Sequence, residues 1–328
     1  MRLLIITDRC INLDLDAVYR IAPILTKFDI LDKAYVCDRA HVGAKDFFNL
    51  EDTAQVPVVP LSLEYSYENA LMHPIEYISP KDVTFLWMCL NPPIDDNLCE
   101  AISKMFKHAF KMNDPMMAKE AGSKTFLKKL RPVLEDGYIP DMKVCETPED
   151  LETFSQKHAE FVLKARNSCE GHGIKLVSPK HQYADFRTLD EAQVFLVDNP
   201  RSVAMQFLNP KAQSDNRVVV ANGEILGCLN RTPMPNGWLC NVGQGGGYSV
   251  IEHDEREEEI VKRIDPIMRE NGIFLYGMDT LLTKNEERVL SEVNTQNPGG
   301  LSHIDAELGV DTHQTKLVEL MLSAIKHR

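Results

Sequence analysis

The sequence has no apolar run that approaches the roughly 20 residues a membrane-spanning helix needs. Its opening stretch, MRLLIITDRC, reaches the charged Asp8 too early for the apolar core of a signal peptide. Basic charge is also in deficit, because 36 lysines and arginines face 49 aspartates and glutamates, which leaves a net charge of −13. These absences predict a cytoplasmic protein whose main partner is neither nucleic acid nor an anionic membrane.

The eight cysteines are scattered along the chain, and no Cys-x-x-Cys pair occurs among them. Isolated cysteines predict reduced thiols in a cytoplasm and argue against a zinc module. A Walker A motif is missing as well, because Gly-Lys-Ser/Thr does not occur. The acidic net charge does not exclude a local basic pocket that binds a nucleotide.

The rest of the composition is that of a globular protein, since 44% of the 328 residues are apolar and 26% are charged. This length is enough for two or three packed units. Apolar runs at 2–7, 33–38 and 83–90 predict buried strands. A helix between the first two is predicted from apolar residues at helical spacing, namely Val18, Ile21, Leu25 and Phe28. Strands that alternate with helices predict a doubly wound N-terminal unit.

Two patterns in the second half of the chain predict β-hairpins. In 217–229, two apolar runs meet at Asn222 and Gly223, a pair that favours a type I′ turn. In the other, 273–279 and 288–294 are joined by the polar residues TKNEE.

Four further segments complete the secondary-structure prediction. The stretch NDP at 113–115 indicates a boundary, and 160–165 is typical of a strand. An amphipathic helix is predicted over 254–271 and should end at Gly272. The last helix is predicted from its apolar residues Leu317, Leu320, Met321 and Ile325.

The second predicted hairpin carries polar side chains that suit a metal ion. Glu292 and Asn294 lie two residues apart in a strand, so they share one face. Asp279, expected at the end of the partner strand, should lie near them. Two carboxylates and an amide oxygen suit a hard cation such as Mg²⁺, which usually shares its ligands with substrate phosphates. Solvated strand residues are the alternative interpretation of the same pattern.

Two glycine-containing segments have the composition of phosphate-binding or mobile loops. Lys164 ends a predicted strand, and Gly171 and Gly173 follow where backbone N–H groups could approach phosphate oxygens, although an ordinary surface turn has the same pattern. The segment 242–249 has four glycines in five residues, which predicts unusual backbone angles or a mobile cover. Two polar residues flank this segment and could face an anion: Arg231 and Asn241.

Taken in order, these motifs resemble those of the ATP-grasp superfamily, and more closely those of bacterial glutathione synthetase, an ATP-dependent ligase. The resemblance runs nearly from end to end and is carried by MRLLIITD, MCLNPP, NDPMMAKEAGSKTF, FVLKARNSCEGHGI, MQFLNPKAQSDNRVVVANGEIL, CLNRTP, GMDTLL and SEVNTQNPGG. The order and spacing of the C-terminal blocks are specific to the family.

The resemblance implies a role for each matching residue on the nucleotide side. Lys124 and Lys164 match the two lysines that hold ATP phosphates. The segment 166–173, with Gly171 and Gly173, matches the small loop that closes on them.

Further along the chain, Gln206, Phe207 and Leu208 belong to a segment that matches the one whose backbone faces adenine. Asp215 and Arg217 match polar positions at the start of the next strand, and Arg217 is expected among the nucleotide-binding residues.

The remaining matches concern the transferred phosphoryl group and the metal. Arg231 matches an arginine beside that group and is expected, with Lys164, to be catalytic. The glycines within 242–247 match the large mobile loop. Asp279, Glu292 and Asn294 match the magnesium ligands.

The resemblance implies that ATP phosphorylates a substrate carboxylate and that an amine then attacks the acyl phosphate, giving an amide, ADP and phosphate. ATP and Mg²⁺ are the implied cofactors, with Mn²⁺ as an alternative metal. The implied substrates are a small carboxylate and an amine, such as an amino acid or a small peptide. Related enzymes form homo-oligomers, so that state is compatible with this chain.

The implied architecture is an ATP-grasp fold of mixed α/β and α+β class. Residues 1–112 would form an N-terminal Rossmann-like (pre-ATP-grasp) domain, 113–200 the central lobe, and 201–328 the C-terminal lobe with the metal site. ATP is expected between the last two lobes, with the acceptor approaching from the N-terminal unit.

Three residues depart from the family pattern. Cys89 and Leu90 stand where an arginine and a lysine are usual, and Ser302 stands where the family has another arginine. Basic groups there would grip substrate carboxylates, so the departures affect the acceptor site rather than the nucleotide site. Candidates to replace the missing charge are His303, Arg166 and His172.

Two other functions are compatible with these residues. An ATP-grasp kinase would stop at a stable phosphate ester. A non-catalytic switch would bind Mg·ATP without turnover, although pure binding needs fewer of the residues named above.

Overall fold

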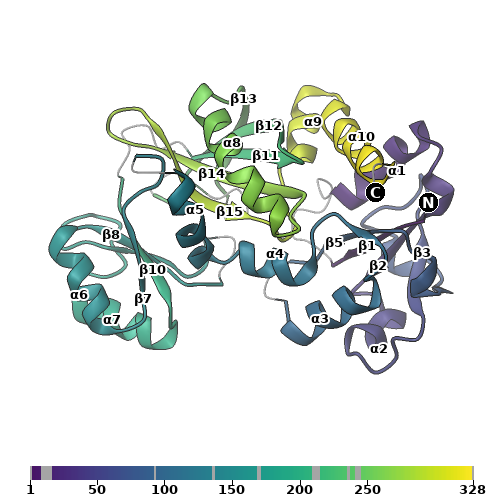
Figure 1. Cartoon of the computed structure of the whole chain (residues 1–328), viewed down its shortest axis with the longest axis horizontal. Helices are drawn as coiled ribbons and strands as arrows, with labels where there is room; N and C mark the ends of the chain where they lie inside the picture. The colour runs from purple at the N-terminus through teal and green to yellow at the C-terminus, as the bar shows by residue number, and fades with distance from the viewer. Residues whose placement is uncertain are drawn as a thin grey trace.

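The computed structural model describes residues 2–8, 17–91, 94–134, 137–167, 171–208, 215–234, 237–240 and 245–326. The strands in these ranges form three sheets, and the five-stranded C-terminal sheet lies between the other two (Figure 1). No helix in the same ranges is both long enough and apolar enough to cross a membrane. The mixture of sheets and helices confirms the predicted α/β and α+β class.

The N-terminal sheet has the strand order β4-β3-β2-β1-β5-β6. Its strands are β1 (Leu3–Thr7), β2 (Ala34–Asp38), β3 (Val56–Pro60), β4 (Glu76–Ile78), β5 (Phe85–Cys89) and β6 (Phe110–Lys111). Strands β2, β1, β5 and β6 run parallel, as alternating strands and helices require, whereas β3 and β4 extend the sheet antiparallel. The three strands predicted here are confirmed as β1, β2 and β5.

The helices of this unit are α1 (Ala17–Lys27), α2 (Lys45–Phe48) and α3 (Asp96–Met105). The predicted apolar spacing is confirmed in α1, where Val18, Ile21 and Leu25 are fully buried. Their core also contains residues of α10 (Thr312–Lys326), which lies beside α1 in Figure 1. The two ends of the described chain therefore pack against each other.

The central sheet has the order β7-β10-β8-β9, and every neighbouring pair is antiparallel. Its elements are β7 (Met142–Cys145), α6 (Pro148–Lys157), β8 (Phe161–Lys164), β9 (Ile174–Val177), α7 (Leu189–Asp198) and β10 (Ser202–Gln206). The predicted strand at 160–165 is confirmed as β8. Because β10 pairs with β7 and β8, this sheet reaches past residue 200, where the central lobe was expected to end.

The C-terminal sheet has the order β13-β12-β11-β14-β15. Its elements are β11 (Asp215–Ala221), β12 (Glu224–Thr232), β13 (Gly247–Ile251), α8 (Glu255–Glu270), β14 (Leu275–Leu282) and β15 (Arg288–Asn294), followed by α9 (Leu301–Leu308) and α10. Both predicted hairpins and both predicted helices are confirmed. Asn222 and Gly223 have positive φ angles of 50° and 82°, as a type I′ turn requires, and Gly272 (φ 68°) follows the end of α8.

Two helices between the N-terminal and central sheets belong to the core of the C-terminal sheet. They are α4 (Pro115–Ala121) and α5 (Leu127–Leu134). Leu130 of α5 is fully buried in the same cluster as Ile264 of α8 and Met278 of β14. The packing therefore ties residues 115–134 to the C-terminal sheet, although the sequence placed them in the central lobe.

The predicted boundary at 113–115 is a buried joint. The amide of Asn113 donates to the carbonyl oxygens of Leu275 at 2.6 Å and Thr295 at 2.8 Å. Its side-chain oxygen accepts from the backbone N–H groups of Phe274 and Leu275, both at 2.8 Å. One side chain thus fixes this connection to the C-terminal sheet.

Candidate functional site

The polar residues of the second hairpin come together as predicted. Asp279 and Glu292 are register partners on β14 and β15, and Asn294 Nδ2 donates to Asp279 Oδ2 at 3.1 Å. Val293, between the two polar residues of β15, is buried in the core on the opposite face. Asp279 lies inside β14 rather than at its end, because the strand continues to Leu282.

A β-bulge brings one further residue of β15 to this site. Leu290 and Val293 both enter the core although they are three positions apart, an odd spacing that regular alternation would place on opposite faces. The register shifts between Asp279, paired with Glu292, and Thr280, paired with Leu290, so Ser291 is the extra residue. No feature of the sequence marked Ser291, because a bulge depends on the pairing of two strands.

Two lysines from different segments converge on β15. Lys124 lies in a 3₁₀ turn at Lys124–Phe126 and forms an ion pair with Glu292. Lys164 Nζ donates to the carbonyl oxygen and the hydroxyl of Ser291, at 3.2 and 3.0 Å. Burial lowers the pKa of Lys164 from its usual value, and Glu292 opposes that shift. The structure therefore gathers the two predicted phosphate lysines beside the predicted metal ligands.

Two arginines, from β11 and from β12 beyond it, contact the carboxylate of Asp279. Arg217 on β11 is the register partner of Asp279 and grips it with two nitrogens, its Nη2 lying 3.0 Å from Oδ2. Arg231 Nη2 on β12 lies 2.6 Å from Asp215 Oδ2 and 3.0 Å from Asp279 Oδ2. Gly277 makes room for this contact, because a Cβ there would lie 3.0 Å from the Arg217 side chain.

The ionisation of this cluster follows from burial and charge. Burial raises the pKa of Asp215 above its ordinary value although Arg231 opposes the shift. For Asp279, burial is outweighed by Arg217 and Arg231, which together hold its pKa well below the ordinary range. Asp279 therefore carries its negative charge, which a cation ligand needs.

The residues present fit a hard cation that shares its ligands with phosphate. Asp279, Glu292 and Asn294 offer carboxylate and amide oxygens on one face. Asp215 Oδ1 and Arg231 Nε are buried and have no hydrogen-bond partner within the described ranges, so the cluster keeps unused polar atoms. No group of three His, Cys, Asp or Glu side chains suited to a metal occurs in the described residues, as expected where one ligand is an amide and phosphates complete the shell.

Part of each predicted glycine loop is described. Gly171 and Gly173 have φ angles of 77° and 72°, in the left-handed region that glycine adopts without strain. In the second loop, Gly245 has a φ of 88° and Gly247 begins β13. Residues 168–170 and 241–244, including Asn241, lie outside the described residues.

The segment expected to face adenine follows β10. Gln206 ends that strand, and its N–H donates to the Asp141 carbonyl at 2.8 Å. The Phe207 ring contacts the rings of His181 and Trp238 edge to face, with centroids 5.3 and 5.9 Å apart. Leu208 is buried, so the end of this segment packs into the protein interior.

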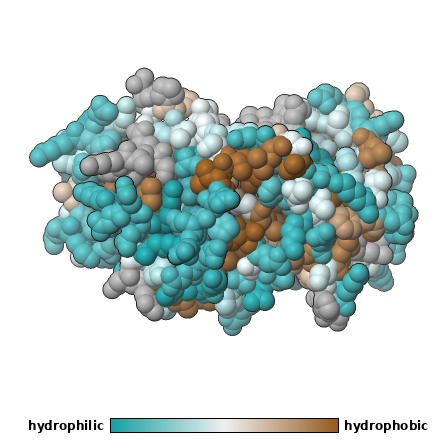
Figure 2. Space-filling model, turned by 90° about the horizontal axis from the view of Figure 1, so that it is seen from above, coloured by the Kyte–Doolittle hydropathy of each residue, from teal (hydrophilic) through white to brown (hydrophobic). Residues whose placement is uncertain are grey.

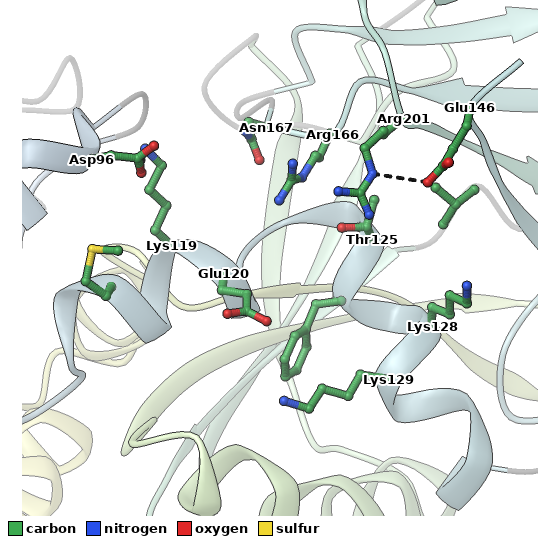
Figure 3. A pocket seen from close by; sticks show the side chains of 13 residues that line it. Asp96, Lys119, Glu120, Thr125, Lys128, Lys129, Glu146, Arg166, Asn167 and Arg201 are labelled. Carbon is green, nitrogen blue, oxygen red and sulfur yellow. Dashed lines mark ion pairs between the residues drawn. The ribbon is translucent and has the colours of Figure 1, made fainter. Parts of the chain in front are cut away.

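A cleft of about 690 Å³ lies beside the turn that carries Lys124 (Figure 3). Thr125 and Arg166 line it, and Arg166 is held there because its carbonyl accepts the Lys124 N–H at 3.0 Å. Lys119 pairs with Asp96 on one side of the cleft, and Arg201 pairs with Glu146 on the other. The Lys124 side chain itself points away, toward Glu292.

The three residues that depart from the family pattern are buried. Cys89 and Leu90 are fully buried, and Ser302 is 4% exposed and bonded to Gln314 at 3.4 Å. A basic side chain at any of these places would be buried in this fold.

Arg20 contacts the segment that carries Ser302, and His303 belongs to that segment. Arg20 Nη1 donates to the Ser302 carbonyl at 3.2 Å. The His303 ring lies edge-on to Tyr248 at 5.2 Å, and burial lowers the pKa of His303. Of the suggested replacements for the missing charge, His303 lies in this segment and Arg166 lines the cleft beside Lys124.

Comparisons with known proteins match much of the chain to one family. Residues 128–309 match the family model described as "Prokaryotic glutathione synthetase, ATP-grasp domain". The chain is 25% identical over 245 residues to glutathione synthetase of Prochlorococcus marinus, covering 74% of this chain and 76% of that protein. It is 27% identical over 198 residues to the Bradyrhizobium diazoefficiens enzyme of the same name, covering 60% and 59%.

Solved structures share the fold at low sequence identity. D-cycloserine synthetase DcsG aligns over 97% of this chain and 99% of its own, with a TM-score of 0.64 and 11% identity. The D-alanine–D-alanine ligase from Bacillus anthracis complexed with ATP aligns over 100% and 98%, with a TM-score of 0.59 and 13% identity. With more than half of its length inside the family model, the chain belongs to the prokaryotic glutathione synthetase family of ATP-grasp proteins and is an ATP-dependent carboxylate–amine ligase.

Proposed function

We propose that this ligase binds Mg·ATP where the two lysines meet the β14–β15 hairpin. The observation that carries the proposal is the convergence of Lys124 and Lys164, from separate segments, on Glu292 and Ser291 of β15. Gln206, Phe207 and Leu208 would border the adenine, and the loop with Gly171 and Gly173 would close over the phosphates. Without such closure a reactive acyl phosphate would be lost to water.

The site residues would have separate roles in phosphoryl transfer. That step needs positioning and charge neutralisation more than covalent help from the protein. Lys124 and Lys164 would hold the phosphates, and Arg231 would face the phosphoryl group as it moves to the substrate carboxylate. Mg²⁺, or Mn²⁺, would neutralise the phosphate charge. Arg231 and Arg217 hold Asp279 ionised and oriented.

The substrates are proposed as a small carboxylate and an amine, such as an amino acid or a short peptide. Glutathione formation from γ-glutamylcysteine and glycine is one option. A different pair is equally consistent, because Cys89, Leu90 and Ser302 are buried and cannot supply the usual basic contacts.

The remaining proposals concern the setting of the enzyme. The division at residues 112 and 200 into an N-terminal Rossmann-like domain and two lobes remains a prediction, as do a cytoplasmic location and a homo-oligomer. No role with nucleic acid is proposed, given the net charge of −13.

The test is ADP release, with mass spectrometry of products, over a panel of carboxylate and amine pairs that includes γ-glutamylcysteine with glycine. An amide formed together with ADP supports the ligase proposal, and the pair that forms it identifies the substrates. A stable phosphate ester instead of an amide would indicate a kinase. Binding of Mg·ATP without turnover across the panel would favour a switch.

A further inference from the structure

A row of polar side chains crosses the C-terminal sheet on the face opposite the proposed nucleotide site. Asn230, Asn216 and Thr280 are register partners on β12, β11 and β14. Asn230 Nδ2 donates to Asn216 Oδ1 at 3.0 Å. Asn216 and Thr280 are 2% and 0% exposed, so these polar groups need partners inside the protein.

Each member of this row is a chain neighbour of a site residue. Asn216 lies between Asp215 and Arg217, as three consecutive residues of β11. Likewise, Asn230 precedes Arg231, and Thr280 follows Asp279. Successive side chains of a strand point to opposite faces of the sheet. Hydrogen bonds that hold the row on one face therefore also restrain the strand backbone that carries the site residues on the other face.

One buried carboxylate from α8 holds the row. Glu257 is 0% exposed, and its Oε1 accepts from Asn216 Nδ2 at 3.0 Å and from Thr280 Oγ1 at 2.5 Å. Its Oε2 accepts the Asp254 N–H at 3.0 Å and closes the cap of α8. The charge is offset by Arg288, whose Nε lies 4.0 Å away and whose Nη1 donates to the Thr280 carbonyl at 3.4 Å.

The cap of α8 uses only Oε2 of Glu257, so it does not explain the two contacts that Oε1 makes with the strands. Burying a charge costs more than burying an apolar side chain of similar size, even when the charge is paired. The other inward-facing residues of α8 include apolar ones, namely Ile260, Val261, Ile264 and Met268. Unlike these apolar residues, Glu257 makes directional hydrogen bonds from α8 to two strands, β11 and β14.

We infer that Glu257 is a positioning residue for the ligase reaction, because its Oε1 ties β11 to β14 in the row directly behind Arg217 and Asp279. Asn216 in turn accepts a hydrogen bond from Asn230 of β12, the strand that carries Arg231. The inference rests on the proposed assignment of these front residues to nucleotide and metal. Small displacements of such groups lower rates steeply, since misplacement by about 1 Å can cost on the order of 100-fold.

The test compares Glu257→Leu, Glu257→Gln and Thr280→Val in the full chain. The readouts are affinity for Mg²⁺ with the non-hydrolysable analogue AMP-PNP, and amide hydrogen exchange in β11 and β14. We expect roughly 10- to 100-fold weaker binding in Glu257→Leu, the usual effect of losing a contact that orients a ligand. Most affinity should return in Glu257→Gln, whose side-chain oxygen still accepts from Asn216 and Thr280. Exchange should rise in both strands of the leucine variant.

Asp265→Asn is the matched control. Asp265 lies two turns further along α8, is 4% exposed, and accepts from Arg269 at 2.7 Å and Tyr276 at 3.4 Å, away from the row. Its loss should lower the free energy of unfolding but leave analogue binding unchanged.

Equal stability losses in Glu257→Leu and Asp265→Asn, with analogue affinity unchanged in both, would overturn the inference. If the leucine variant does not fold, Thr280→Val decides, because it keeps the side-chain shape and removes one hydrogen bond. Wild-type affinity in that variant would also overturn the inference. Both readouts need no acceptor, so they stay informative if the proposed reaction is wrong.

Discussion

Lys164 Nζ lies 3.0 Å from the hydroxyl oxygen of Ser291 and 3.2 Å from its carbonyl oxygen, although 127 positions separate the two residues. Lys164 belongs to the central sheet and Ser291 to the C-terminal sheet, so this contact joins the two sheets. It exists because the β15 bulge adds Ser291 beside Glu292.

Ser291→Ala should weaken ATP binding modestly. The variant removes the hydroxyl acceptor of Lys164 and keeps the carbonyl, so the loss should be near that of one hydrogen bond to a charged group, about 1.5 kcal/mol, or roughly tenfold in affinity. A calorimetric titration with ATP measures the dissociation constant. An unchanged dissociation constant would show that Lys164 is placed by its other contacts.

Glu292→Gln tests the metal assignment. The variant removes one ligand charge and the ion pair with Lys124, so we expect ATP turnover to fall by on the order of 100-fold, with a higher Mg²⁺ requirement. ADP release measured against Mg²⁺ concentration gives both quantities. Full turnover at ordinary Mg²⁺ would mean that Glu292 is not a metal ligand.

Asn113→Ala should loosen the joint between the N-terminal unit and the C-terminal sheet. The amide makes four buried contacts to backbone groups, and their loss leaves unpaired donors and acceptors worth about 3 kcal/mol of unfolding free energy. Urea unfolding measures this loss. A change below about 0.5 kcal/mol would mean that water replaces the side chain without cost.

Asp141→Asn should have a pH-dependent effect on stability. Burial raises the pKa of Asp141, but hydrogen bonds from His158 and Lys157, at 2.8 and 2.5 Å, outweigh it and lower the pKa to about 2. A lowered folded-state pKa stabilises the protein above the unfolded value near 3.8, and this contribution disappears as pH falls through about 2. Allowing for partial exposure, the contribution is on the order of 1–2 kcal/mol.

Urea unfolding at pH 7, 4 and 3 measures this dependence. The difference between wild type and Asp141→Asn should be constant from pH 7 to about 5 and then shrink toward acid. Asp32→Asn is the control, because Asp32 is 69% exposed and its only described ion pair, with Lys33, is 3.9 Å long. If the stability difference between the two proteins does not change with pH, the substitution acts through the shape of the side chain at position 141 and not through its charge.

The sequence by itself determined the elements whose signals are local. Hydrophobic period and turn residues predicted β1, β2, β5 and β8, both C-terminal hairpins and α8, because each pattern reports one element and its buried face. Alternation along β15 placed Glu292 and Asn294 on one face. The order of the motifs identified the ATP-grasp family.

Only the tertiary structure decided what depends on pairing between distant segments. The bulge at Ser291, the antiparallel β3 and β4, and the packing of α5 on α8 follow from contacts that no local pattern encodes. The polar row with Glu257 is a further case, because its members look like ordinary strand and helix residues in the sequence. Strand register brings them together, and register is a property of the folded sheet.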